Sequence, residues 1–112
     1  MTEELESSRG VYERKDEVQI LDVREPYEWE AGHIEEAIHI PLGQLMSGAA
    51  MEGVAKDRPV LVVCKTGNRS ELAALMLQAR GYDAHNLEGG TEGWASAGLP
   101  LVAADGGPGK VA

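Results

Sequence analysis

The sequence predicts an α/β domain with a mainly parallel sheet of four to five strands and helices on both faces. Short, mostly apolar segments typical of strands covered on both faces occur at 18–23, 37–40, 60–64 and 83–87. Helical signals stand between these segments, as expected where crossover helices join parallel strands. The length of 112 residues fits one domain that buries a single core without disulfides.

Proline and glycine mark the first elements of the chain. Thr2 could begin a short helix, which Gly10 weakens, and the strand at 18–23 follows. Pro26 suits the first turn of a second helix, because proline fits best where a helix begins. Gly32 halts that helix, so we expect only a short one here.

The middle of the chain carries weaker signals. The strand at 37–40 is short because Pro41 ends it. We expect a helical turn at 42–46 and a loop or weak helix at 48–56, before the central strand at 60–64.

The clearest predicted helix runs over 70–80, and Gly81 ends it. One apolar face is predicted from the helical spacing of Leu72, Leu75, Met76 and Ala79. After the strand at 83–87, a glycine turn leads to a short helix at 91–97, which carries Trp94.

We predict one domain over 1–102, followed by a disordered tail over 103–112. The tail is rich in glycine and alanine and has few large apolar side chains with which to pack. The acidic residues are spread along the chain, and the cluster between Glu25 and Glu36 is expected to be a solvated face rather than a recognition patch.

Composition excludes several classes of function. The formal net charge of -9 argues against nucleic acid and anionic membranes as partners, because their phosphates require a basic surface. The chain has one cysteine, so it has neither an internal disulfide nor the cysteine and histidine cluster of a zinc site. We therefore expect a cytoplasmic protein without a metal or cofactor. A monomer is also expected.

The single cysteine, Cys64, lies where the central strand ends and the longest helix is about to begin. Ligands of parallel sheets bind at the carboxyl ends of the strands, so this is where a site is expected. The candidate loop continues with Lys65, Thr66, Gly67, Asn68, Arg69 and Ser70. Two cations and a helix N-terminus lower the pKa of a thiol, and a glycine lets backbone N–H groups turn toward an anion.

The structural alternative for Cys64 is a small apolar residue at the end of a buried strand. The flanking glycine, arginine and helix start favour a reactive thiol instead. Asp22 and Arg24 lie at the carboxyl end of another strand, where we expect an ion pair that supports the loop rather than a catalytic role. His33 has no Asp or second His at metal or triad spacing, which argues against a role as a base or metal ligand.

In these motifs the chain resembles a single-domain rhodanese, a sulfurtransferase. The first signature runs from Leu21 to Glu25, with Glu28 and Trp29, and continues with residues 32–34, Ala37 and residues 40–41. Residues 64–70 resemble the active-site loop of that family, and residues 87–90 with Trp94 resemble its closing signature. The resemblance departs from the family at Glu35 and Glu36, where a small residue or a proline–glycine step is usual. We also expect the usual N-terminal strand to be missing or trimmed. The resemblance implies that His33 is a hydrogen-bonded structural histidine.

The resemblance implies a mechanism for the loop. Cys64 would take the outer sulfur of a small anionic donor such as thiosulfate, and would hold it as a persulfide. A thiophilic acceptor would then remove that sulfur, cyanide in an assay and a thiol or protein in the cell. The resemblance also implies that Lys65 and Arg69 attract the donor, Arg69 through a two-pronged contact with its oxygens.

Two alternatives stay open. The domain could be a sulfur-delivery or regulatory binding module with little turnover, although Cys64 and Arg69 are both present. It could also be a phosphate or arsenate enzyme on the same fold. Phosphatases similar to rhodaneses have a loop one residue longer, whereas Cys64 to Arg69 spans six residues. The shorter loop favours one bound sulfur over a tetrahedral phosphate.

Overall fold

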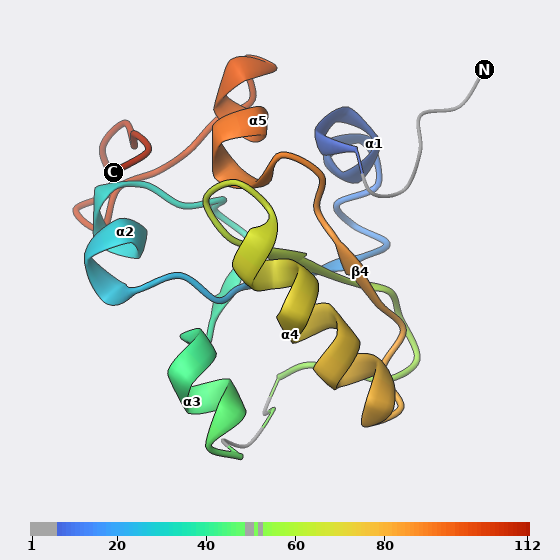
Figure 1. Cartoon of the computed structure of the whole chain (residues 1–112). Helices are drawn as coiled ribbons and strands as arrows, with labels where there is room; N and C mark the ends of the chain where they lie inside the picture. The colour runs from blue at the N-terminus through green and yellow to red at the C-terminus, as the bar shows by residue number, and fades with distance from the viewer. Residues whose placement is uncertain (1–6, 49–50, 52) are drawn as a thin grey trace.

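The computed structural model describes residues 7–48, 51 and 53–112. In this part of the chain a four-stranded parallel sheet forms the centre of the molecule, with strand order β2-β1-β3-β4 (Figure 1). The strands are β1 (Gln19–Asp22), β2 (Ile38–His39), β3 (Val60–Val63) and β4 (Ala84–Asn86). Each lies inside a segment that the sequence predicts to be a strand, and the sheet has the predicted parallel direction.

Five described helices lie around the sheet: α1 (Ser8–Glu13), α2 (Pro26–Ala31), α3 (Leu42–Met46), α4 (Asn68–Ala79) and α5 (Gly90–Ser96). Buried side chains of α3 and α4 pack on one face of the sheet, and those of α1 and α5 pack on the other. None of the helices in the described ranges is long and apolar enough to cross a membrane.

The central strand β3 divides the core into two halves, because successive side chains of a strand point to opposite faces. Val60 and Val62 pack in the cluster under α3 and α4, and Cys64 continues that alternation just beyond the strand. Leu61 and Val63 pack in the other cluster, with Trp94 of α5. The alternation therefore places the thiol of Cys64 on the α4 side of the sheet.

The apolar face predicted for α4 is wrong. Leu72 and Leu75 are 46% and 58% exposed. The stripe that faces the sheet consists instead of Ser70, Ala73, Ala74 and Leu77. The small alanines let the helix approach the strands, and Ser70 has to face Cys64, so the start of the helix sets which stripe is inside. The helix also begins two residues earlier than predicted, at Asn68.

The C-terminal segment 103–112 differs from the predicted disordered tail. Val102 forms isolated bridges with His33 and Pro108, and the chain then folds back along the end of α2. The Lys110 N–H donates to Ala31 O at 3.0 Å, and the Gly109 N–H donates to Leu101 O at 2.9 Å. Backbone hydrogen bonds need no large side chains, which is why composition alone did not predict this packing.

At the N-terminus, α1 begins at Ser8 and contains Gly10, the residue predicted to weaken a helix here. The Ser7 hydroxyl accepts from the Gly10 N–H at 3.0 Å and caps the first turn. The helix start predicted at Thr2 lies outside the described residues, as do residues 49, 50 and 52 of the predicted loop or weak helix at 48–56.

Candidate active site

Cys64 lies immediately after β3, at the carboxyl edge of the sheet and beneath the first turn of α4. The residue is only 1% exposed, so its sulfur is held in a nearly dry environment. In α5, Gly90 packs directly against this strand end: its φ is +59°, and a side chain there would collide with the carbonyl oxygens of Cys64 and Lys65. The Thr91 N–H also donates to Cys64 O at 2.9 Å, which fixes the backbone below the loop.

Two hydrogen-bond donors converge on the sulfur of Cys64. The Gly67 N–H donates to Sγ at 2.9 Å, and the Ser70 hydroxyl lies 3.3 Å from the same atom. Gly67 has a φ of +112°, a conformation that side chains disfavour, and it is buried at the N-terminus of α4. The glycine thus lets the loop turn back over the thiol, as the sequence predicted.

These contacts act on the pKa of Cys64. Burial is the largest influence and by itself raises the pKa, because the thiolate loses solvation. The Ser70 hydroxyl lowers it most, followed by the backbone N–H groups of Ser70, Gly67 and Thr66. The donors outweigh burial, so the pKa of Cys64 lies below that of an ordinary thiol. The loop therefore favours the thiolate, which is the nucleophilic form of cysteine.

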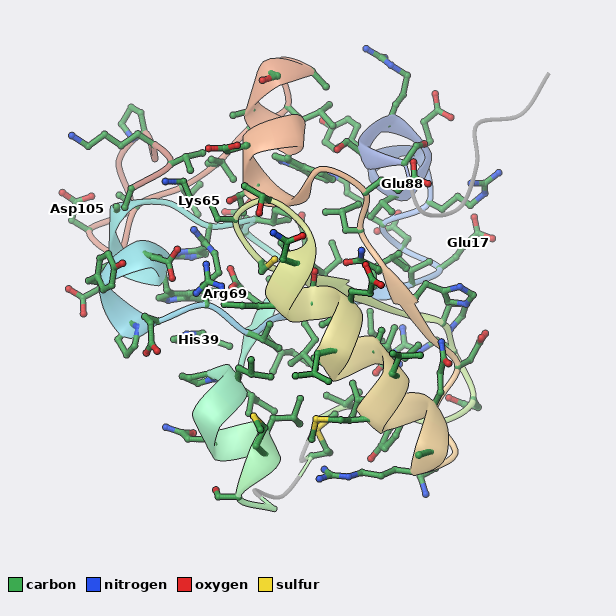
Figure 2. All side chains as sticks on the ribbon, viewed as in Figure 1. Glu17, His39, Lys65, Arg69, Glu88 and Asp105 are labelled. Carbon is green, nitrogen blue, oxygen red and sulfur yellow. The ribbon has the colours of Figure 1, made fainter. Side chains whose placement is uncertain are left out.

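Arg69 makes a two-pronged contact, but with a carboxylate of the protein itself. Its Nη1 and Nη2 donate to Oε1 and Oε2 of Glu28 at 2.8 and 2.9 Å. Figure 2 shows Arg69 directed from the start of α4 toward α2, which carries Glu28. The expectation that Arg69 binds the donor's oxygens through a two-pronged contact is therefore wrong, because Glu28 occupies both terminal nitrogens of the guanidinium. The Arg69 side chain nevertheless stays 36% exposed.

The ion pair changes the pKa of both partners. The hydrogen bonds from Arg69 hold the pKa of Glu28 at about 2, below its ordinary value of 4.5, despite the opposing effect of burial. Glu28 in turn raises the already high pKa of Arg69. Glu28 Oε1 also accepts from the Glu25 N–H at 3.0 Å, so the carboxylate is fixed from two sides.

The other predicted loop residues lie at the rim. Lys65 is half-buried, and Thr66 and Asn68 are exposed. Figure 2 shows Lys65 at the loop, above the start of α4 and above Arg69 in this view. The structure thus brings Gly67 and Ser70 to the sulfur, and leaves the side chains of Thr66 and Asn68 in solvent.

Asp22 and Arg24 form a buried ion pair, as the sequence predicted. Arg24 donates to both carboxylate oxygens of Asp22 at 2.8 to 3.0 Å and to Gly32 O at 2.7 Å. The two residues are 1% and 0% exposed. Nη1 of Arg24 has no hydrogen-bond partner among the described residues. The pair connects the end of β1 to the end of α2, and so supports the segment that carries Glu28.

The histidines of this region are also tied into the structure. His33 Nδ1 hydrogen-bonds to Trp29 O at 2.8 Å, and its ring stacks on Trp29 with centroids 3.6 Å apart. His39 stacks on Trp29 as well, at 4.7 Å. Within the ranges the structure describes, no group of three or more metal-binding side chains is close enough to hold an ion.

Sequence reasoning assigned no role in the site to Glu28 or Asn86, although Glu28 stands beside Trp29 in the first signature. Glu28 stands three residues after Glu25, which is the spacing of a capping box and is a local signal that fixes its side chain. Asn86 ends β4, beside the central strand, and its carboxamide bonds to Gly67 and Ser70. The sequence signal that could have identified Asn86 is its place as a polar residue at the carboxyl end of the strand next to β3.

Known proteins are similar to this chain over most of its length. The family model described as Rhodanese-like domain matches residues 9–97. A protein named Sulfurtransferase from Allochromatium vinosum is 37% identical over 92 residues, which cover 81% of this chain and 84% of that protein. A probable adenylyltransferase/sulfurtransferase, MoeZ of Mycobacterium tuberculosis, is 39% identical over 77 residues, covering 68% of this chain but 20% of that longer protein. The crystal structure of a rhodanese-related protein from Thermoplasma volcanium has a TM-score of 0.79 at 33% identity, covering 86% of this chain and 94% of that one.

Proposed function

The chain belongs to the rhodanese-like domain family, and on that premise we propose that it is a sulfurtransferase that carries sulfane sulfur on Cys64. One observation supports this most directly. At the start of the loop 64–70, the Cys64 sulfur accepts from the Gly67 N–H and lies within reach of the Ser70 hydroxyl. A similar protein is named Sulfurtransferase and covers most of this chain.

In the first step, the Cys64 thiolate attacks the outer sulfur of thiosulfate or a similar donor. A new sulfur–sulfur bond forms to Sγ, and the sulfur–sulfur bond of the donor breaks. The electron pair of the broken bond leaves with sulfite, so Cys64 becomes an anionic persulfide without any external oxidant. The thiolate is available for this attack because hydrogen bonds lower the pKa of Cys64.

In the second step, an acceptor nucleophile attacks the terminal sulfur of the persulfide. Cyanide becomes thiocyanate, or a thiol becomes a persulfide, and the bonding pair returns to Sγ as the thiolate. The donors that stabilise the resting thiolate also stabilise this leaving group, which lowers the barrier to release. A free thiol and a thiol acceptor are compatible with a reducing compartment such as the cytoplasm.

The cations have separate roles in this proposal. Arg69 is held by Glu28, so it contributes a fixed positive charge near the loop and has no free pair of N–H groups with which to bind the donor. Lys65 lies at the rim and attracts the anionic donor as a mobile charge. The rest of the surface repels anions, since the chain carries a formal net charge of -9, and this makes the local cations more important.

The test is a mass measurement after incubation with thiosulfate, followed by a thiocyanate assay with cyanide. We expect one added sulfur atom and thiocyanate formation, both abolished in Cys64→Ala and in the shape-matched Cys64→Ser. Because the chain has one cysteine, no second thiol can take the sulfur. Turnover that survives in either variant, or a wild type that neither loads nor turns over with any sulfane donor, would refute the proposal.

The alternative, a sulfur-delivery or regulatory module, is separated by the same assay. Such a module loads one sulfur atom on Cys64 but does not release it to cyanide or to small thiols. A phosphate enzyme would instead hydrolyse p-nitrophenyl phosphate in a reaction that Cys64→Ser abolishes.

A further inference from the structure

The carboxamide of Asn86 bridges two points of the loop over Cys64. Its Nδ2 donates to Gly67 O at 3.1 Å, and its Oδ1 accepts from the Ser70 hydroxyl. Asn86 is the last residue of β4, so it holds the loop from the neighbouring strand rather than from β3 or α4 themselves. A Cβ built on Gly67 would lie 3.6 Å from Asn86 Nδ2, at an ordinary van der Waals distance.

The two groups that Asn86 binds belong to the two residues that donate to the thiol. Gly67 donates its N–H to Sγ at 2.9 Å, and Ser70 Oγ lies 3.3 Å from Sγ. The Ser70 hydroxyl has one proton, so it cannot donate to Asn86 and to Cys64 at the same time. While the thiol is protonated, Ser70 can donate to Asn86 and accept from the thiol. When the thiol ionises, the proton of Ser70 turns toward the sulfur.

We propose that Asn86 is a positioning residue of this site, which holds Gly67 through its carbonyl so that the Gly67 N–H reaches Cys64 Sγ, and which accepts the Ser70 proton only while the thiol is protonated. The inference rests on the proposed function, because it treats the Cys64 thiolate as the reacting group. Asn86 itself does not touch the sulfur in this arrangement. It is neutral, whereas the charged side chains of the loop are Lys65 and Arg69, and Arg69 is paired with Glu28.

A second side-chain amide offers a control for a merely structural role of Asn86 between α4 and β4. Gln78, farther along α4, donates from Nε2 to Ala84 O at 2.8 Å. This bond ties the same helix to the same strand, two turns away from Ser70. Gln78→Ala is therefore a matched control for Asn86→Ala, since each change removes one amide between α4 and β4 or its loop.

The experiment measures how the rate of Cys64 alkylation by iodoacetamide depends on pH, because that rate follows the thiolate and needs no sulfur donor. We expect Asn86→Ala to raise the midpoint by roughly one pH unit, since it weakens hydrogen bonds to the charged form. Gln78→Ala should leave the midpoint at the wild-type value. In the Ser70→Ala background the shift caused by Asn86→Ala should persist and be no smaller, because it acts through Gly67 and Asn86 no longer competes with the thiolate for the Ser70 proton.

A wild-type measurement covers the case in which Asn86→Ala does not fold. The side-chain amide NMR signals of Asn86 should titrate with the alkylation midpoint, and should stop doing so in Cys64→Ser. An unchanged alkylation profile in folded Asn86→Ala, or Asn86 signals that ignore ionisation of the thiol, would overturn the inference even if Cys64 carries sulfur. Failure of persulfide loading with these shifts intact would instead count against the proposed function alone.

Discussion

At the level of single residues, Cys64 shows how a buried sulfur can still be kept reactive. Burial raises its pKa, and the hydrogen bonds of the loop lower it by more. The sequence pointed to the two cations of the loop, the helix N-terminus and the backbone N–H groups freed by Gly67. In the structure the Ser70 hydroxyl lowers the pKa of Cys64 most, followed by backbone N–H groups of the loop. This order matters because a hydrogen bond depends on exact placement, whereas a charge acts over a distance.

The Glu28–Arg69 ion pair leads to a prediction about stability in acid. The folded-state pKa of Glu28, about 2, is below its ordinary value of 4.5, so the pair stabilises the fold fully above that ordinary value. This contribution is lost as pH falls from about 4.5 toward about 2. We expect Glu28→Gln to reduce the free energy of unfolding at neutral pH by about 2 kcal/mol, allowing for screening of Arg69. Urea unfolding at a series of pH values should show this difference shrinking in acid.

The control for this prediction is Glu30→Gln, which removes an exposed carboxylate from the same helix. It should change stability by less than about 0.5 kcal/mol at any pH. If Glu28→Gln and Glu30→Gln behave alike, the ion pair does not contribute as we infer. A difference that persists undiminished in acid would likewise contradict the assigned pKa.

At the level of elements, α4 is the helix whose face the sequence placed wrongly. It has one apolar stripe through Leu72 and Leu75 and another through Ala73 and Leu77, and periodicity alone favours the stripe with the larger side chains. The structure buries the other stripe, because Ser70 on that stripe has to reach Cys64. The active-site contact therefore sets the rotation of the helix.

This rotation is tested by two leucines of the same helix. Leu77 is 0% exposed and Leu75 is 58% exposed. Leu77→Ala should lower the free energy of unfolding by about 2–5 kcal/mol, because it leaves a cavity against the sheet. Leu75→Ala should change it by less than about 0.5 kcal/mol, because an exposed side chain buries little surface. Urea unfolding measures both, and equal costs would mean that the helix is rotated differently.

At the level of the whole molecule, the C-terminal segment completes one side of the domain. Ala104, Gly109 and Lys110 donate backbone hydrogen bonds to the segments 30–31 and 101, each within 2.9–3.0 Å. Gly32 lies so close to Lys110 that a Cβ on it would collide with that backbone. The carbonyl of Gly32 accepts from Arg24, so the segment packs beside the buried ion pair.

Removal of residues 103–112 should therefore destabilise the domain, whereas removal of an unpacked tail would not. We expect a loss of about 1–3 kcal/mol from the missing hydrogen bonds and contacts. Removal of 111–112 alone, beyond the last of these hydrogen bonds, serves as the matched control and should cost little. In the full chain, the N–H groups of Gly109 and Lys110 should exchange with solvent more slowly than in an unfolded peptide. Fast exchange there would show that the segment does not pack as described.

The sequence by itself determined the fold class, the four strand segments and the loop that begins at Cys64. These features follow from local patterns: apolar runs form strands, and a glycine before a helix start permits the turn over the thiol. The loop motif could also be recognised in the sequence, because its functional residues are neighbours in the chain. Lys65, Gly67, Arg69 and Ser70 all stand within six residues of the cysteine.

Only the tertiary structure decided which side chains support that loop. Glu28 meets Arg69 across 41 positions of the chain, and Asn86 meets Gly67 across 19. Such pairs depend on strand order and on the rotation of α4, which packing in three dimensions sets and local sequence does not encode. The same reason explains the C-terminal segment, whose backbone hydrogen bonds have no signature in composition.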